Sequence, residues 1–268
     1  MKLFALGRGG AFAPMSIGNS NFMLTSESGK RMMFDFGSTA PYIYRDELKM
    51  DFGDIDAVYI SHLHADHCNL EMFAFHRYFL PKIVNGFPEK PKLYMVKSLM
   101  EEMWENTLRG GLESLQGKIM NLTDYFDCRP VCINGSFDWE GYNFTPIQTV
   151  HVRSGYIIKH SYGLAIRKIQ IADNGERYIE QDKYDAYITS DTQFDRGLNE
   201  YYNRAKIIFH DCETGQHKSI VHSHYDDLKG LKDDVKKKMF LYHYNNKVDS
   251  FEEDGFAGFV EKGQEFEF

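Results

Sequence analysis

The most constraining feature of this chain is a run of metal-binding residue types, His62-Leu63-His64-Ala65-Asp66-His67, separated only by Ser61 from the apolar residues 57–60. A short apolar segment of this composition predicts a buried strand. If strand geometry continues through residue 64, the side chains of His62 and His64 point the same way, because alternate residues share a face. Three imidazoles and one carboxylate within six residues suit a divalent metal, above all zinc. The sequence therefore predicts a metal site at the end of a strand.

Short apolar segments between turn signals recur along the chain and predict an α/β fold with two sheets flanked by helices. The predicted strands are residues 2–6, 21–25, 31–36, 57–61, 93–96, 142–150, 162–168, 186–189, 206–210 and 239–243, with a hairpin tip at 138–141. An apolar stripe predicts a helix over residues 72–80. Capping-box spacing predicts helices that start at Ser98, with Glu101, and at Ser223, with Asp226.

The chain of 268 residues shows no repeat and no Pro-, Gly- or Ser-rich linker, so we predict a single domain over residues 1–268. Its tail, residues 249–268, contains five phenylalanines that we expect to pack on the chain's own core or on a partner chain. Residues 236–238, all lysine, are interpreted as a solvated helix end. Residues 106–118 are interpreted as an ordinary loop, with a mobile lid as the alternative.

Charge and composition limit the partners and the compartment. The net charge of −8 argues against a protein that neutralises many phosphates of a long nucleic acid. Four cysteines without CxxC spacing, Cys68, Cys128, Cys132 and Cys212, indicate reduced thiols. The apolar run after Met1 is too short for a signal peptide, and no segment approaches the ~20 apolar residues of a membrane span. We expect a soluble, cytoplasmic protein that does not bind membranes.

The H-x-H-x-D-H spacing resembles the signature of the metallo-β-lactamase superfamily. The superfamily's later motifs are matched in order by His151, Asp191 and His243, each where a predicted strand gives way to a loop. The resemblance implies a four-layer αββα sandwich with two metals, Zn²⁺ or alternatively Mn²⁺ or another divalent ion. By resemblance, His62, His64 and His151 hold one metal, Asp66, His67 and His243 hold the second, and Asp191 bridges them. Asp66 would also orient the attacking water, and Asp35 would play a structural role behind the ligands.

Two further segments, Phe209-His210-Asp211-Cys212-Glu213 and Val221-His222-Ser223-His224, are similar to the paired motifs of tRNA 3′-processing endonucleases. By resemblance, Asp211 and His222 form a dyad that delivers a proton to the leaving oxygen. A histidine held by a carboxylate suits that task. His210 remains ambiguous, and the remaining histidines are interpreted as structural: His76, His160, His217 and His224.

Those endonucleases carry a long basic arm for tRNA between the motifs marked here by His151 and Asp191. Only 39 residues separate the two positions, mostly in predicted strands, so the arm has no room. This combination resembles the phage-encoded anti-Pycsar phosphodiesterases, including the opening Gly7-Arg8-Gly9-Gly10-Ala11-Phe12 and Asn19-Ser20-Asn21. The resemblance implies a homodimer that hydrolyses 3′,5′-cyclic nucleotide monophosphates to evade host immunity, acting in the host cytoplasm if phage-encoded.

Three alternatives stay open at this point. An RNA 3′ endonuclease would use the same motifs, although the charge disfavours an extended nucleic acid. A non-catalytic binder would sequester a nucleotide without consuming it. Thioester or lactone hydrolysis is a further possibility, because the fold does not fix the reaction.

Overall fold

A computed structural model describes all residues of the chain, 1–268. The chain divides into two compact units, each built from separate pieces of sequence. Unit 1 comprises Met1–Gly7, Ala11–Ile133 and Lys262–Glu267, and unit 2 comprises Arg8–Gly10, Asn134–Glu261 and Phe268. Whether residues 1–268 form a single domain depends on how these two units fold together, so the single domain stays a prediction.

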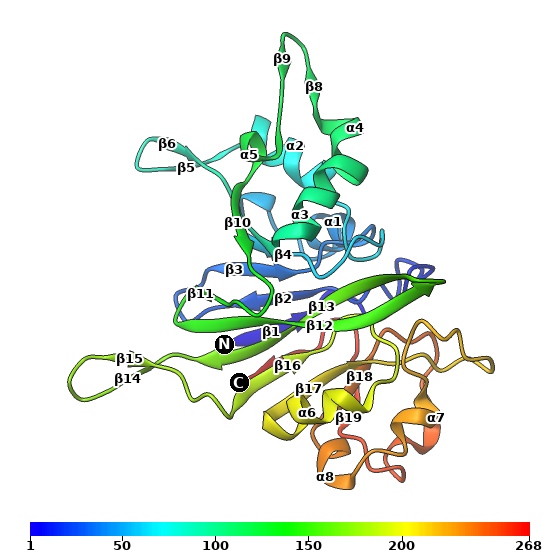
Figure 1. Cartoon of the computed structure of the whole chain (residues 1–268). Helices are drawn as coiled ribbons and strands as arrows, with labels where there is room; N and C mark the ends of the chain where they lie inside the picture. Colours follow the sequence, from blue (N-terminus) through cyan, green and yellow to red (C-terminus); the bar gives the residue numbers. More distant parts are fainter. The chain divides into compact units, whose positions relative to one another are not determined.

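Unit 1 is built on a mixed seven-stranded sheet (Figure 1). Its strands, in spatial order, are β10 (Asp127–Val131), β7 (Lys92–Val96), β4 (Ile55–Tyr59), β3 (Arg31–Phe34), β2 (Phe22–Thr25), β1 (Lys2–Ala5) and β20 (Glu265–Glu267). The first four are parallel, and the last three add antiparallel pairs. The segment after β4 therefore leaves the sheet at the carboxyl edge of its parallel half, which is where binding loops gather in such sheets.

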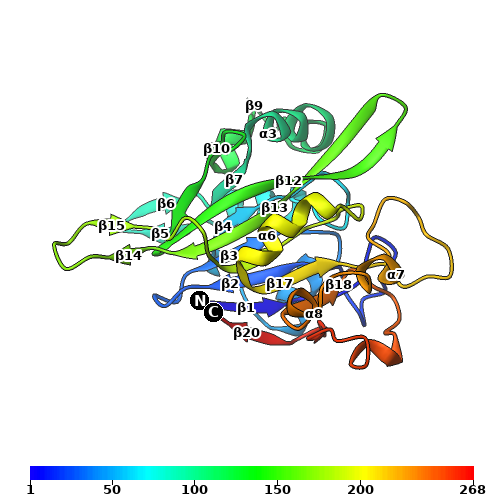
Figure 2. The ribbon, with the colours of Figure 1, turned by 60° about the horizontal axis from the view of Figure 1, so that its bottom comes forward.

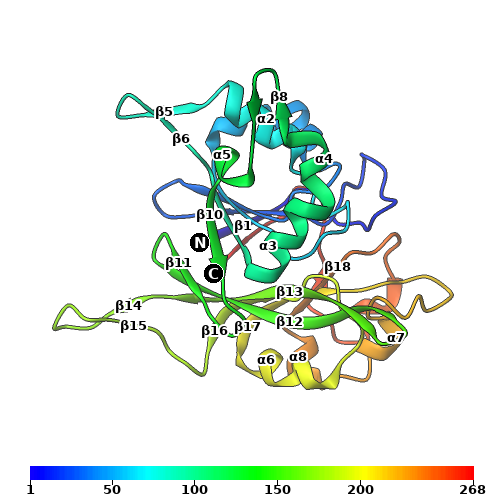
Figure 3. The same ribbon diagram turned by 45° about the horizontal axis from the view of Figure 1, so that its top comes forward.

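Helices of unit 1 gather on one side of its sheet (Figure 3). They are α1 (Ala40–Tyr42), α2 (Glu71–Phe79), α3 (Lys97–Met103), α4 (Arg109–Leu112) and α5 (Leu122–Tyr125), with the π-helices η1 (Ile43–Glu47) and η3 (Trp104–Leu108) and the 3₁₀ turn η2 (Phe52–Asp54). Aromatic side chains join them to the sheet: Phe36 contacts both Phe52 and Phe73. Two small hairpins complete the unit, β5 (Lys82–Val84) with β6 (Phe87–Glu89), and β8 (Ser114–Leu115) with β9 (Lys118–Ile119).

Unit 2 has its own seven-stranded sheet (Figure 2). In spatial order the strands are β11 (Phe137–Trp139), β12 (Tyr142–Ser154), β13 (Ile157–Lys168), β16 (Tyr184–Ile188), β17 (Ala205–Asp211), β18 (Met239–Tyr242) and β19 (Gly258–Phe259). The strands up to β16 pair antiparallel, whereas β16 to β19 are parallel. The hairpin β14 (Gln170–Ile171) with β15 (Arg177–Tyr178) extends from this unit. The α/β class and all ten predicted main strands are confirmed, with ends shifted by a few residues.

Three short helices and two 3₁₀ turns pack against the parallel half of the unit 2 sheet. They are α6 (Asn199–Arg204), α7 (Tyr225–Leu228), α8 (Asp233–Lys236), η4 (Arg196–Leu198) and η5 (Asp249–Phe251). The tail contributes to this core, since Phe256 and Phe259 are buried in it and Phe251 packs against it. Phe266 instead pairs with Leu3 in unit 1. The expectation that the tail packs on the chain's own core is thus met.

Both predicted capping boxes are wrong, although helices are present. The helix α3 begins two residues earlier than expected, with Val96 at its N-cap and no side-chain cap. At α7 the cap is His224, whose Nδ1 accepts the Asp226 N–H at 3.2 Å. Ser223 donates instead to the Thr192 carbonyl at 2.9 Å. A better-placed imidazole therefore replaces the serine that the sequence spacing favoured.

Two further interpretations are corrected. Residues 106–118 are not an ordinary loop, because they form η3, α4 and β8 and reach β9. Lys236 is buried rather than solvated: its Nζ pairs with Asp233 at 3.0 Å and lies 6.0 Å from the Phe256 ring centroid. Only Lys237 in that lysine run is exposed.

The cysteines are free, as predicted, with Cys68 and Cys212 buried and Cys132 exposed. None of the helices is long and apolar enough to span a membrane.

Candidate metal centre

The unit 1 cluster consists of His62, His64, Asp66 and His67 and occupies the loop that follows β4. The strand ends at Tyr59, so the expected continuation of strand geometry through His64 is wrong. The two imidazoles nevertheless meet, with ring centroids 4.8 Å apart and His62 Nε2 3.2 Å from His64 Nδ1. His62 is buried and His64 is exposed. The loop, not strand alternation, brings them together.

Behind this loop, Asp35 fixes the orientation of His67. One carboxylate oxygen of Asp35 accepts the backbone N–H of Ser61 at 2.7 Å. The other accepts from Ser61 Oγ and from His67 Nδ1, both at 2.7 Å. Burial raises the pKa of Asp35, while the His67 charge and these hydrogen bonds oppose that rise. Asp35 also has a positive φ of 64°, a conformation that aspartate tolerates better than most residues. With Nδ1 engaged, His67 presents Nε2, which lies 3.4 Å from Asp66 Oδ2.

Two residues that hold the loop were not singled out as functional from the sequence. Asn21 Nδ2 donates to the Asp66 carbonyl at 2.9 Å, and Asn21 Oδ1 accepts from the Gly37 N–H at 2.8 Å. A Cβ on Gly37 would collide with the Asp66 backbone, so only glycine allows this approach. The motif Asn19-Ser20-Asn21 was the available signal, since a buried Asn beside a strand needs polar partners.

The unit 2 cluster is assembled at the carboxyl ends of the parallel strands β16, β17 and β18. Asp191 follows β16, Asp211 ends β17 and His243 follows β18. Together with His222 they place one ligand atom each within 4.8 Å of one another. His243 Nε2 lies 3.4 Å from Asp191 Oδ1, and its Nδ1 lies 3.5 Å from Asp211 Oδ1.

His151 reaches the same cluster from a β-bulge. The register between β12 and β13 shifts between Val150 and Val152, which leaves His151 as the extra residue. A bulge re-aims the side chain of the inserted residue. His151 Nε2 lies 3.5 Å from Asp191 Oδ2, and His151 Nδ1 donates to the Val221 carbonyl at 2.9 Å.

Three of the histidines predicted as ligands are oriented in the same way. In His62, His67 and His151 the Nδ1 atom is held by a neighbouring oxygen, from Ser61, Asp35 and Val221 respectively. Each ring therefore presents Nε2 for coordination. An anchored second nitrogen is the usual arrangement behind metal-binding histidines, because it fixes tautomer and ring orientation.

The Asp191 backbone is fixed by hydroxyl groups from the neighbouring strands β12 and β13. Its carbonyl accepts from Thr149 Oγ1 at 3.2 Å and from Ser161 Oγ. The preceding residue, Ser190, has a positive φ of 54°. These contacts stabilise a backbone conformation that residues other than glycine rarely adopt without such support.

The predicted dyad is present in the structure. Asp211 Oδ2 accepts the Thr192 N–H at 2.8 Å and His222 Nδ1–H at 2.9 Å. Burial alone lowers the pKa of an imidazole, but the charge and hydrogen bond of Asp211, helped by the charge of Asp191, raise the pKa of His222 to about 10. His222 therefore holds a proton and presents Nε2.

Two of the four histidines interpreted as structural make structural contacts. His160 Nδ1 donates to the Thr149 carbonyl at 3.0 Å, and His224 caps α7. The ambiguous His210 turns away from the cluster, accepting from the Tyr202 hydroxyl at 2.6 Å. Burial lowers the pKa of His210, which keeps its ring neutral.

The residues of both clusters fit a divalent metal. In unit 2, two buried carboxylates lie close to two imidazoles, and such carboxylates repel each other unless a cation or proton lies among them. Imidazole nitrogen with carboxylate oxygen is a donor set that zinc accepts. In unit 1, His62, His64, Asp66 and His67 offer the same donor types.

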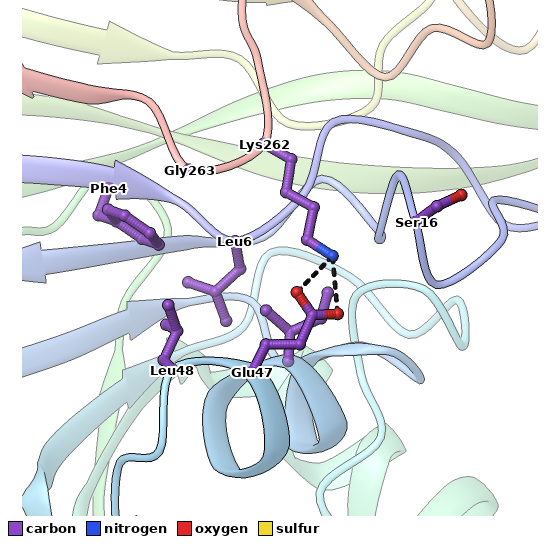
Figure 4. Close-up of a pocket in the computed structure, with 8 residues that line it drawn as sticks. Phe4, Leu6, Ser16, Glu47, Leu48, Lys262 and Gly263 are labelled. Carbon is purple, nitrogen blue, oxygen red and sulfur yellow. Dashed lines mark hydrogen bonds and ion pairs between the residues drawn. The ribbon is translucent and has the colours of Figure 1, made fainter.

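A cavity of about 530 Å³ in unit 1 lies apart from this chemistry (Figure 4). Its lining is largely apolar, and its charged residues, Lys262 and Glu47, pair with each other at 2.7 Å. None of the histidines of the cluster lines it.

Comparisons with known proteins agree on family and fold. The model of the family described as "Anti-Pycsar protein Apyc1" matches residues 1–266. An Anti-Pycsar protein Apyc1 from Paenibacillus harenae is 31% identical over 256 residues, covering 94% of this chain and 93% of that protein. One from Bacillus phage vB_BveM-Goe7 is 30% identical, covering 98% and 97%.

Among solved structures, the metallo-β-lactamase fold protein YhfI from Bacillus subtilis aligns with a TM-score of 0.68 at 14% identity, covering 99% of each chain. That likeness confirms the metallo-β-lactamase fold that the sequence predicted. The family model and the Apyc1 relatives match this chain over nearly its whole length. This chain therefore belongs to the anti-Pycsar protein Apyc1 family.

Proposed function

We propose that this protein is a metal-dependent phosphodiesterase that hydrolyses 3′,5′-cyclic nucleotide monophosphates and thereby removes an immune signal. Family membership, the fold and the His/Asp clusters support a metal-dependent hydrolase. The observation that carries the proposal is the family match across residues 1–266. The net charge of −8 agrees with a small phosphodiester rather than a long polyanion.

For the metal centre, we assign the seven predicted ligands to two divalent ions, Zn²⁺ first. His62, His64 and His151 would hold one ion, Asp66, His67 and His243 would hold the other, and Asp191 would bridge them. Two such ions, when bound, activate water and neutralise charge on a phosphodiester. Support comes from the anchored Nδ1 atoms of His62, His67 and His151, which prepare Nε2 for coordination.

The chain's own residues supply the proton transfer. Asp211 holds His222 through Nδ1, so His222 Nε2 can donate a proton to the leaving 3′ oxygen. Asp66 orients the attacking water from the unit 1 loop. The protein acts as a homodimer, and in the host cytoplasm where a phage encodes it.

The deciding experiment incubates the purified protein with a panel of cyclic mononucleotides and with pre-tRNA, with and without a chelator. We expect cyclic-nucleotide hydrolysis that the chelator abolishes and added Zn²⁺ restores. Cleavage of pre-tRNA alone would identify an RNA 3′ endonuclease instead. Binding of a cyclic nucleotide without consumption, measured by calorimetry, would identify a sequestering binder. Sedimentation of the same sample tests the homodimer.

A further inference from the structure

The opening motif Gly7-Arg8-Gly9-Gly10 has no role in the proposed chemistry, yet part of it joins unit 2. Residues Arg8–Gly10 belong to that unit, although β1 before them and the chain after them belong to unit 1. They contact the segment that directly follows β18, where His243 lies.

His243 occupies an unusual backbone conformation. Its φ is +68°, in the left-handed region that few residues other than glycine adopt, although histidine is among those found there more often. Such a conformation persists only where neighbouring contacts hold it. The contacts of the next residue, Tyr244, are therefore informative about what keeps His243 in place.

Arg8 holds the backbone on the far side of His243. The Tyr244 N–H donates to the Arg8 carbonyl at 3.1 Å. The Arg8 guanidinium donates to the carbonyls of Asn245, at 3.3 Å, and Tyr244, at 3.5 Å. It also lies 4.4 Å from the Tyr244 ring centroid and 3.2 Å from Glu261. Arginine suits this set of contacts better than lysine, because its planar guanidinium group both stacks on a ring and donates hydrogen bonds in several directions.

Gly10 lies directly against the His243 ring. A Cβ at position 10 would lie 2.7 Å from Cε1 of His243, closer than Cβ atoms approach other atoms, and 3.2 Å from its Nε2, so the ring would have to shift. The ring also stacks on His222, with centroids 4.5 Å apart. The absence of a side chain on Gly10 thus leaves the space that the His243 imidazole occupies.

We propose that Arg8 and Gly10 are positioning residues that fix the backbone and the imidazole orientation of His243, and so set the affinity of the centre for metal. This inference rests on the proposed function, in which His243 is a metal ligand. Arg8 acts through the Tyr244 and Asn245 backbone, and Gly10 acts by packing.

The test measures Co²⁺ affinity of the full-length protein by titration against a competing chelator. Changes to groups that orient ligands typically weaken metal binding about 10- to 100-fold, and we expect this range for Gly10→Ala and about 10-fold for Arg8→Ala. Gly110→Ala is the matched control, since a Cβ there meets nothing within 4 Å and we expect unchanged affinity. Arg8→Lys should restore part of the loss, because lysine keeps the charge beside Glu261 but lacks the fork.

A double-mutant cycle separates positioning from general damage. In a His243→Ala background, Gly10→Ala should cause no further loss of Co²⁺ affinity, because the group it positions is gone. Wild-type affinity in Gly10→Ala, together with weakened binding in His243→Ala, would overturn the inference and leave the proposed function intact. Wild-type affinity in His243→Ala would instead overturn its assignment as a ligand.

Thermal unfolding in chelator checks that each variant folds without metal. If Gly10→Ala does not fold, Arg8→Ala decides alone, and wild-type affinity in that variant overturns the inference.

Discussion

The two units reach similar donor sets by opposite routes. In unit 1 the candidate ligands come from one loop, His62 to His67, that follows a single strand. In unit 2 they come from a bulge in β12 and from the carboxyl ends of β16 and β18. A local cluster depends on the conformation of one loop, whereas a dispersed cluster depends on the register of a whole sheet. The difference predicts where each cluster is most sensitive to change.

The largest effect should follow loss of the carboxylate at the centre of the dispersed cluster. Asp191 lies within 3.8 Å of the rings of His151, His222 and His243. We expect Asp191→Ala to lower the metal content and to reduce turnover more than about 10³-fold. That loss is larger than the one caused by removing a single hydrogen-bond donor from an active site. Elemental analysis and cyclic-nucleotide turnover check this.

The exposed Asp173→Ala serves as its control, since that residue lies on the β14–β15 hairpin. Equal zinc and equal turnover in Asp191→Ala and the wild type would contradict the assignment.

The second effect separates proton transfer from metal binding within the same cluster. His222→Ala should reduce turnover about 10²- to 10⁴-fold, the usual range for a general acid, while keeping the metal. The measurement is turnover together with metal content, and the exposed His217→Ala is the control. Loss of metal in His222→Ala would make this residue a ligand rather than a proton donor.

The third effect tests the local cluster through Asp35, which orients His67. Asp35→Asn removes the charge that accepts from His67 and Ser61. We expect about 10- to 100-fold weaker metal binding, because such a partner fixes ring orientation and basicity. Competition with a chelator measures it, and unchanged affinity would show that the loop holds His67 without Asp35.

The smallest effect concerns a histidine outside both clusters. Tyr202→Phe leaves the buried His210 Nε2 without its hydroxyl donor, which should cost about 1–3 kcal/mol of unfolding free energy. Metal content and turnover should remain at wild-type levels. Chemical denaturation measures the stability, and a change in metal content would connect His210 to the site.

The local cluster was readable from the sequence because its ligands are contiguous and follow a clear strand. The positions of His151, Asp191 and His243 were found only through a resemblance, since a lone His or Asp at a strand end has no local signature. The bulge that aims His151 at the cluster leaves no mark in the sequence, because it arises from the register of β12 against β13.

The groups that orient the ligands were the least predictable. Asn21, Gly37 and Gly10 act through contacts with residues distant in the sequence, and spacing contains no information about such contacts. The helix caps failed for a related reason: His224 outcompetes Ser223 because Ser223 finds a better acceptor in Thr192.

The exchange of segments between the units has a consequence for how the chain folds. Because Arg8–Gly10 and β20 each join the unit built mostly from the other half of the sequence, neither unit is a continuous stretch of chain. Contacts between residues so far apart close slowly, so the last steps of folding should await the C-terminus. A cut at residues 133–134 would leave both fragments incomplete, and each should gain order only when the other is added.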